Sequence, residues 1–353
     1  MKEATVQLRK SYRKDAARSA RRARRGSASG ASASGASASG SAPARRPRGN
    51  GRHTQFATRV FEGPASTPTP TPIAAPSTRA SAARRGCVTL FLSCQGGSGA
   101  TTIASTVAAM LARSGRQVCL LDLDFQFGGS LTALNLSNRY PLSTIMADLA
   151  SGSKQRADRR LTAEQLLARL PRHADTGVHV VSQVGHADGV SQLEPRLFSK
   201  LLRGLRRVFD HVIIDGVRDF NDFALPAMDL SDNIVLVATQ DVPSLRGLVM
   251  RLELLGRLSF DHAAVHVALN RFSRRGPVPP TAIESVGITP SFTIANDFRA
   301  VHGALGDGQT LLDACPRSRV TRDIQAMARH LYGVEVDRHR ESGFLRRLVR
   351  RKR

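Results

Sequence analysis

A glycine-rich segment that directly follows an apolar run constrains this chain more than any other feature. The apolar run, residues 88–92, predicts a buried strand, and residues 103–113 carry apolar side chains at helical spacing. Between them lies the sequence Ser-Cys-Gln-Gly-Gly-Ser-Gly-Ala-Thr-Thr, residues 93–102. A strand, a glycine-rich turn and a helix in this order present backbone N–H groups and a helix N-terminus to an anion. The segment therefore predicts a phosphate-binding loop.

This loop meets the common pattern G-x-x-x-x-G-K-[ST] only in part. Ala100 stands where the pattern has a lysine, whereas Thr101 keeps the hydroxyl that is expected to bind Mg²⁺. Glycine-rich turns also occur in loops that bind nothing. The loop alone therefore leaves both interpretations open.

Acidic side chains stand at the ends of two further predicted strands. The strand over residues 117–124 ends in Asp122 and Asp124, and the strand over residues 212–215 ends in Asp215. Ligands of open α/β sheets bind outside the carboxyl ends of the strands, so we expect these acids to converge on the loop. The alternative is that Asp122 and Asp124 only cap a strand end, and that Asp215 followed by glycine is an ordinary turn.

Together these segments resemble the MinD/ParA group of P-loop ATPases and, within it, the CpaE/TadZ family of Flp (Tad) pilus assembly proteins. The resemblance covers roughly residues 87–332 and predicts an α/β fold, a doubly wound and mostly parallel sheet. Besides the glycine-rich loop, the segments that carry it are residues 121–128, 239–246, 270–272 and 295–299.

The resemblance implies ATP and Mg²⁺ as cofactors and gives individual residues a role. Asp124 would orient the attacking water, and Asp215 would act with it in catalysis. Mg²⁺ would be held by Thr101, Asp122 and Asp215. Asn270 would meet the base, although it also fits an ordinary strand-exit turn. The loop residues expected to contact the nucleotide are Gln95, Gly96, Gly97, Ser98, Gly99, Ala100, Thr101 and Thr102.

Two cations that the MinD/ParA group normally carries are missing. Gln95 stands where a lysine would reach the nucleotide of a dimer partner, and Ala100 where a second lysine would lie. Phosphoryl transfer depends on positioning and on neutralising charge, and each lost charge-assisted contact costs about 1.5–3 kcal/mol. Backbone N–H groups and Mg²⁺ would still hold the phosphates. We therefore expect ATP binding with little or no hydrolysis, and whether the chain is an enzyme stays open.

The net charge of +24 over 353 residues is concentrated at the two ends of the chain. Residues 1–86 carry +15 and residues 338–353 carry +7, which leaves only +2 between them. Residues 1–85 predict a disordered tail that is basic and rich in Ser, Ala, Gly and Pro. Residues 86–335 predict the degenerate MinD/ParA-like P-loop domain, and residues 336–353 a basic C-terminal tail.

The basic tails suit nucleic acid or an anionic membrane surface, or they are simply solvated. The four cysteines form no C-x-x-C pair and no run of 18 apolar residues exists, so we expect a cytoplasmic protein. The resemblance adds peripheral placement at the inner membrane or cell pole, a homodimer, and pilus or secretion assembly proteins as partners. The predicted function is a nucleotide-stabilised scaffold in pilus assembly. The alternative is an active partition or positioning ATPase that binds DNA or membrane through its basic ends.

Overall fold

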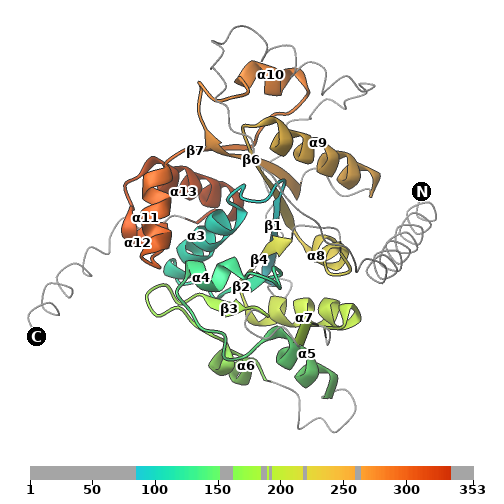
Figure 1. The fold of residues 1–353 in the computed structure, drawn as a ribbon. Helices are drawn as coiled ribbons and strands as arrows, with labels where there is room; N and C mark the ends of the chain where they lie inside the picture. The colour runs from blue at the N-terminus through green and yellow to red at the C-terminus, as the bar shows by residue number, and fades with distance from the viewer. Residues whose placement is uncertain are drawn as a thin grey trace, which may run out of the picture. The chain divides into compact units, whose positions relative to one another are not determined.

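The computed structural model describes six segments of the chain (Figure 1): residues 85–151, 162–183, 189–190, 193–217, 221–258 and 264–334. The expected C-terminal tail and all but Arg85 of the expected N-terminal tail lie outside these segments, so their disorder stays a prediction. The chain divides into two compact units, and the first contains residues 1–68 and 252–260. Its described residues, 252–258, form the end of helix α9 (Val242–Arg257) and the residue after it.

The second unit is built on one seven-stranded sheet with the order β3-β2-β4-β1-β5-β6-β7. Every ladder between neighbouring strands is parallel, which confirms the predicted α/β fold class. Strand β1 pairs with β4 on one side and β5 on the other, so the glycine-rich loop leaves the centre of the sheet. The strands are β1 (Cys87–Ser93), β2 (Val118–Asp122), β3 (His179–Val181), β4 (His211–Val217), β5 (Asn233–Thr239), β6 (Val265–Phe272) and β7 (Phe292–Ala295).

Helices cover both faces of the sheet (Figure 1). On one face, α3 (Ala100–Arg113) lies across β1, β2 and β4 and contacts α4 (Gly129–Ala133), α12 (Leu311–Ala314) and α13 (Arg319–Tyr332). On the other face, α7 (Pro195–Val208) contacts β4, and α8 (Ala224–Leu230) contacts β1. The other helices of the described segments are α5 (Leu142–Ser151), α6 (Ala163–Arg169), α10 (Pro280–Ser285) and α11 (Phe298–Gly306).

The central strands are apolar along their length because both faces of the sheet are covered. On the α3 face, alternate strand residues such as Phe91, Ile213 and Val235 pack against the helices in one buried cluster. Burying each large side chain of this kind contributes about 1.5–3 kcal/mol. The buried core therefore fixes the positions of the glycine-rich loop and of the strand-end acids at the carboxyl edge of the sheet.

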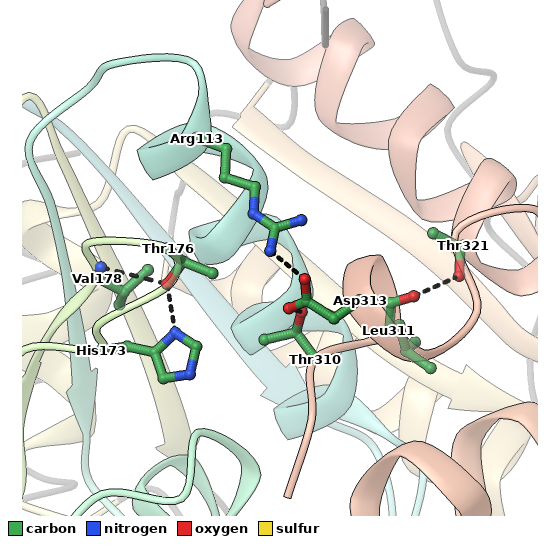
Figure 2. A network of polar contacts seen from close by, with 8 residues as sticks. All are labelled: Arg113, His173, Thr176, Val178, Thr310, Leu311, Asp313 and Thr321. Carbon is green, nitrogen blue, oxygen red and sulfur yellow. Dashed lines mark hydrogen bonds and ion pairs between the residues drawn. The ribbon is translucent and has the colours of Figure 1, made fainter. Parts of the chain in front are cut away.

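Polar contacts fasten the far end of α3 to the C-terminal helices (Figure 2). Arg113 forms an ion pair with Asp313, which also accepts a hydrogen bond from Thr310 Oγ1 (2.6 Å). Although burial acts against them, these two contacts lower the pKa of Asp313. Close by in the same view, His173 Nδ1 shares a hydrogen bond with Thr176 Oγ1 (2.8 Å). Helix α3 is thus held at its C-terminal end, away from the loop.

Two element boundaries differ from the sequence-based prediction. Helix α3 begins at Ala100 and not at Ile103, because the chain enters it directly from the left-handed Gly99. Asn270, expected just after its strand, lies within β6, which continues to Phe272. Among the described helices, none is both long and apolar enough to cross a membrane.

Candidate nucleotide and metal site

The glycine-rich loop makes a tight turn between β1 and α3. Gly97 and Gly99 have φ angles of 78° and 91°, in the left-handed region that glycine enters without steric cost. The Ser98 N–H donates to the Gln95 carbonyl (3.1 Å), and the Ser93 hydroxyl donates to the same oxygen (2.5 Å). The predicted loop residues are therefore brought into one compact turn.

The first turn of α3 opens onto this loop. The Ile103 N–H donates to the Gly99 carbonyl, as in a regular helix. The preceding amides, those of Ala100, Thr101 and Thr102, have no backbone acceptor within the described segments. With the positive end of the helix dipole, such amides favour an anion. This geometry is what the sequence predicted for a phosphate site.

The two positions that lack a lysine differ in their surroundings. Gln95 is exposed, whereas Ala100 is 6% exposed and belongs to the core cluster beside α3. A lysine at position 95 would reach solvent at once. The side chain of a lysine at position 100 would have to pass through the packed start of α3 before its ammonium group reached solvent.

Strands β2 and β4 place two buried carboxylates side by side. Asp122 and Asp215 are direct partners in the parallel ladder and are 0% and 1% exposed. Asp122 accepts hydrogen bonds from the N–H groups of Asp124 (2.9 Å) and Ser130 (3.0 Å). The Ser130 hydroxyl donates to Asp215 Oδ2 (3.2 Å). Asp215 Oδ1 is buried and, within the described segments, has no hydrogen-bond partner.

The environment of this pair disfavours two negative charges. Burial, followed by the neighbouring Asp215, raises the pKa of Asp122 to about 7. Burial also raises the pKa of Asp215, although its polar neighbours Thr101, Gly216 and Ser130 act in the opposite direction. A divalent cation would relieve this repulsion. The two carboxylates and the Thr101 hydroxyl supply the oxygen ligands that Mg²⁺ prefers, so these residues fit that ion.

Asp124, the expected catalytic acid, lies just beyond the end of β2. Its Oδ1 accepts hydrogen bonds from the N–H groups of Gln126 and Phe127, both at 3.3 Å. These contacts form a turn that holds the carboxylate outside the buried pair, in a partly exposed position. Its role in orienting water stays a prediction.

Asn270 comes to the loop from β6, as expected for a residue of the site. Its Nδ2 donates to the Ser98 carbonyl (2.8 Å). A Cβ on Gly99 would lie 2.2 Å from this Nδ2, so the close packing requires glycine. In the structure the amide therefore contacts the loop itself, and the expected contact with a base stays a prediction.

Sequence reasoning missed three residues that shape the site. Ser130 bridges the two buried acids, and Gly129 leaves room for Thr101, whose Cγ2 would lie 3.0 Å from an added Cβ. Arg271 donates from Nη2 to the Gly97 carbonyl (3.0 Å). Only the Gly-Gly-Ser sequence at 128–130 offered a signal for the first two, since paired glycines indicate close backbone approach.

Comparisons with known proteins agree with this geometry. Residues 88–261 match a family model described as an AAA domain. Over 191 residues the chain is 26% identical to the septum site-determining protein MinD of Thermotoga maritima. That match covers 53% of this chain and 65% of the relative, slightly less than two thirds of its length.

Solved structures show the same architecture. A ParA family ATPase from Chlorobium tepidum aligns with a TM-score of 0.60 and 22% identity, over 70% of this chain and 100% of that one. MinD from Pyrococcus horikoshii, complexed with Mg-ADP, aligns with a TM-score of 0.57 and 18% identity, over 70% and 96% of the chains. The chain has the MinD/ParA P-loop NTPase fold.

This fold is the one that the broader resemblance predicted. The sequence relative shows that the chain is similar to a MinD protein, and the family model that it is similar to an AAA domain. The narrower resemblance, to the CpaE/TadZ pilus proteins, stays a prediction.

The acid pair gives the MinD/ParA fold a pH dependence that can be measured without nucleotide. Because Asp122 has a pKa of about 7 when folded and an ordinary value of 3.8, the folded chain holds a proton that the unfolded chain releases between these values. Metal-free protein should therefore be less stable at pH 8 than at pH 6. Thermal unfolding in EDTA measures this, and Asp122→Asn should flatten the slope.

The buried histidines of the described segments produce the opposite trend. Burial lowers the pKa of His179, His211 and His266, which makes the folded chain lose stability as pH falls and not as it rises. An equal loss from pH 6 to pH 8 in wild type and Asp122→Asn would contradict the assignment. Added Mg²⁺ should raise the unfolding temperature more at pH 8 than at pH 6.

Proposed function

We propose that this protein binds Mg-ATP without rapid turnover, and that nucleotide stabilises a homodimer serving as a scaffold in Flp/Tad pilus assembly. The observation that carries the nucleotide part is the buried pair Asp122 and Asp215, which lies close to Thr101 of the glycine-rich loop. One oxygen of this pair, Asp215 Oδ1, has no hydrogen-bond partner within the described segments. A purely structural strand end would have no need to bury two carboxylates in contact.

Binding is expected to exceed turnover because the site keeps its ground-state contacts and lacks its cations. Backbone N–H groups of the loop and Mg²⁺ would hold the phosphates before reaction. Hydrolysis requires extra stabilisation of the charge that develops in the transition state. Neither Gln95 nor the buried Ala100 can supply it. Asp124 and Asp215 would act as the catalytic residues of the slow ATP hydrolysis that remains.

The pilus role rests on the resemblance and not on the geometry. Its support is the set of segments shared with the CpaE/TadZ family, above all residues 121–128 and 239–246. In the structure the second of these runs from the end of β5 into the start of α9. There Asp241 Oδ1 accepts from the Ser244 N–H (3.0 Å), and the Ser244 hydroxyl accepts from the Thr239 N–H (2.9 Å). The partners would be pilus or secretion assembly proteins.

Equilibrium and single-turnover measurements on the purified chain test this proposal. We expect saturable binding of a fluorescent ATP analogue that requires Mg²⁺, together with phosphate release close to the uncatalysed background. The exposed change Gln95→Lys should tighten binding without altering the fold. Brisk phosphate release from the wild type would refute the scaffold proposal, and absence of Mg-ATP binding would refute the nucleotide site.

The alternative is a positioning ATPase that contacts DNA or membrane, and one observation on α7 favours it. Arg196, Lys200, Arg203 and Arg207 are all exposed, and their spacing of four, three and four residues places them on one face of the helix. Such a stripe attracts polyanions in a salt-dependent way. DNA-stimulated phosphate release that is lost in the double variant Lys200→Glu, Arg203→Glu would favour this function over the scaffold.

A further inference from the structure

Two consecutive residues of β6 hold two consecutive carbonyl groups of the glycine-rich loop. Arg271 Nη2 donates to the Gly97 carbonyl (3.0 Å), and Asn270 Nδ2 donates to the Ser98 carbonyl (2.8 Å). The Arg271 N–H in turn donates to Asn270 Oδ1 (2.8 Å). With its oxygen engaged in this way, the Asn270 amide has its nitrogen directed at the loop. We call these two residues and their three hydrogen bonds the loop clamp.

The clamp determines which way the loop's amides face. In a trans peptide the C=O and the following N–H point in opposite directions across one plane. Because the Ser98 carbonyl is directed at Asn270, the Gly99 N–H must point away from β6. It therefore joins the first amides of α3, which have no backbone acceptor within the described segments. The clamp gathers these donors on the side where an anion would lie.

The backbone of Arg271 is left-handed at the point where the pairing of β6 with β7 shifts its register, between Leu269 and Phe272. Its φ angle is 52°, in the left-handed region that non-glycine residues avoid, although its side chain is exposed and plays no part in the core. Strain of this kind persists where the surrounding structure requires it, often at a binding site. Here it brings the guanidinium onto the loop.

We propose that Arg271 is a positioning residue that, together with Asn270, holds the loop ready for a polyphosphate and so offsets the absence of a lysine at position 100. The inference rests on the proposed function in one respect, that the ligand of the loop is the polyphosphate part of a nucleotide. It gives Arg271 a role in shaping the phosphate-facing loop and not in contact with the base. It also places a permanent positive charge 3.0 Å from the loop's backbone.

Amide hydrogen exchange in the full, nucleotide-free chain tests the clamp directly. In Arg271→Gly, exchange across residues 96–99 should become faster, while the unfolding temperature stays equal or rises because glycine relieves the strained φ. Arg274→Gly removes the same charge from an exposed neighbour and should change neither the loop's exchange nor its binding. Unchanged loop exchange in Arg271→Gly would overturn the clamp.

Two separate probes, Mg-pyrophosphate and adenosine, test which part of the nucleotide the clamp serves. Arg271→Gly should weaken pyrophosphate binding about tenfold, Arg271→Lys should restore part of it, and adenosine affinity should stay unchanged. A loss of affinity confined to adenosine would overturn the inference, because Asn270 and Arg271 would then serve the base. If the wild type binds neither probe, the proposed function fails, whereas the exchange experiment still decides whether Arg271 holds the loop.

Discussion

Gly216→Ala is expected to destabilise the fold by about 3 kcal/mol or more. Gly216 follows Asp215 within β4 and has a φ of 83°. An added Cβ would lie 2.3 Å from the Asp124 backbone nitrogen and 2.7 Å from Asp122 Oδ1. Main-chain atoms at the end of β2 cannot move aside cheaply. Denaturant unfolding measures the loss.

Gly115→Ala is the matched control for this experiment. Gly115 has a similar φ of 85°, but no heavy atom lies within 4 Å of the position of its Cβ. Gly115→Ala should therefore lower the free energy of unfolding only by the cost of the left-handed backbone, about 1 kcal/mol. Equal losses in the two variants would show that the ends of β2 and β4 are farther apart than the structure places them.

Thr101→Val is expected to weaken Mg-ATP binding by about tenfold to a hundredfold. The change keeps the branched shape that packs against Gly129 and removes only the hydroxyl beside Asp215. Thr101→Ser keeps the hydroxyl and should bind almost as the wild type does. Isothermal titration of both variants with ATP, with and without Mg²⁺, measures these affinities.

The effect of Thr101→Val on ATP affinity is expected to depend on Mg²⁺. In EDTA, wild type and Thr101→Val should bind ATP with the same low affinity, because the hydroxyl is expected to act through the ion. If the valine variant is equally weakened without Mg²⁺, Thr101 contacts the phosphates directly and the metal assignment is wrong.

The strands and the acids at their ends were predictable because parallel strands leave a strong pattern. Apolar runs such as residues 88–92 and 233–239 are buried on both faces, and carboxyl ends of parallel strands meet at one edge of the sheet. The short helices were harder to predict. Helix α8 contains Pro226 and α11 contains Gly303, and both residues disfavour helix when judged locally.

The sequence predicted that distant strand ends meet, but not which individual side chains contact which backbone atoms. Nothing near Arg271 in the chain indicates that it reaches Gly97, 174 residues away, or that its backbone is left-handed. Likewise the burial of Ala100 follows from the packing of α3 on the sheet and not from the loop pattern. Such pairings depend on the register of the assembled sheet, which one sequence does not reveal.

The thiol of Cys94, which lies two residues before Gly96, can report on opening of the glycine-rich loop. Cys94 is 5% exposed, its carbonyl accepts from Arg251 (3.2 Å), and burial raises the pKa of its thiol to about 12. The thiolate is the reactive form, so alkylation at pH 8 must wait until this end of β1 opens. The rate at which iodoacetamide modifies Cys94, followed by mass spectrometry, would therefore report loop opening in the unmodified sequence, and a bound polyphosphate should slow it.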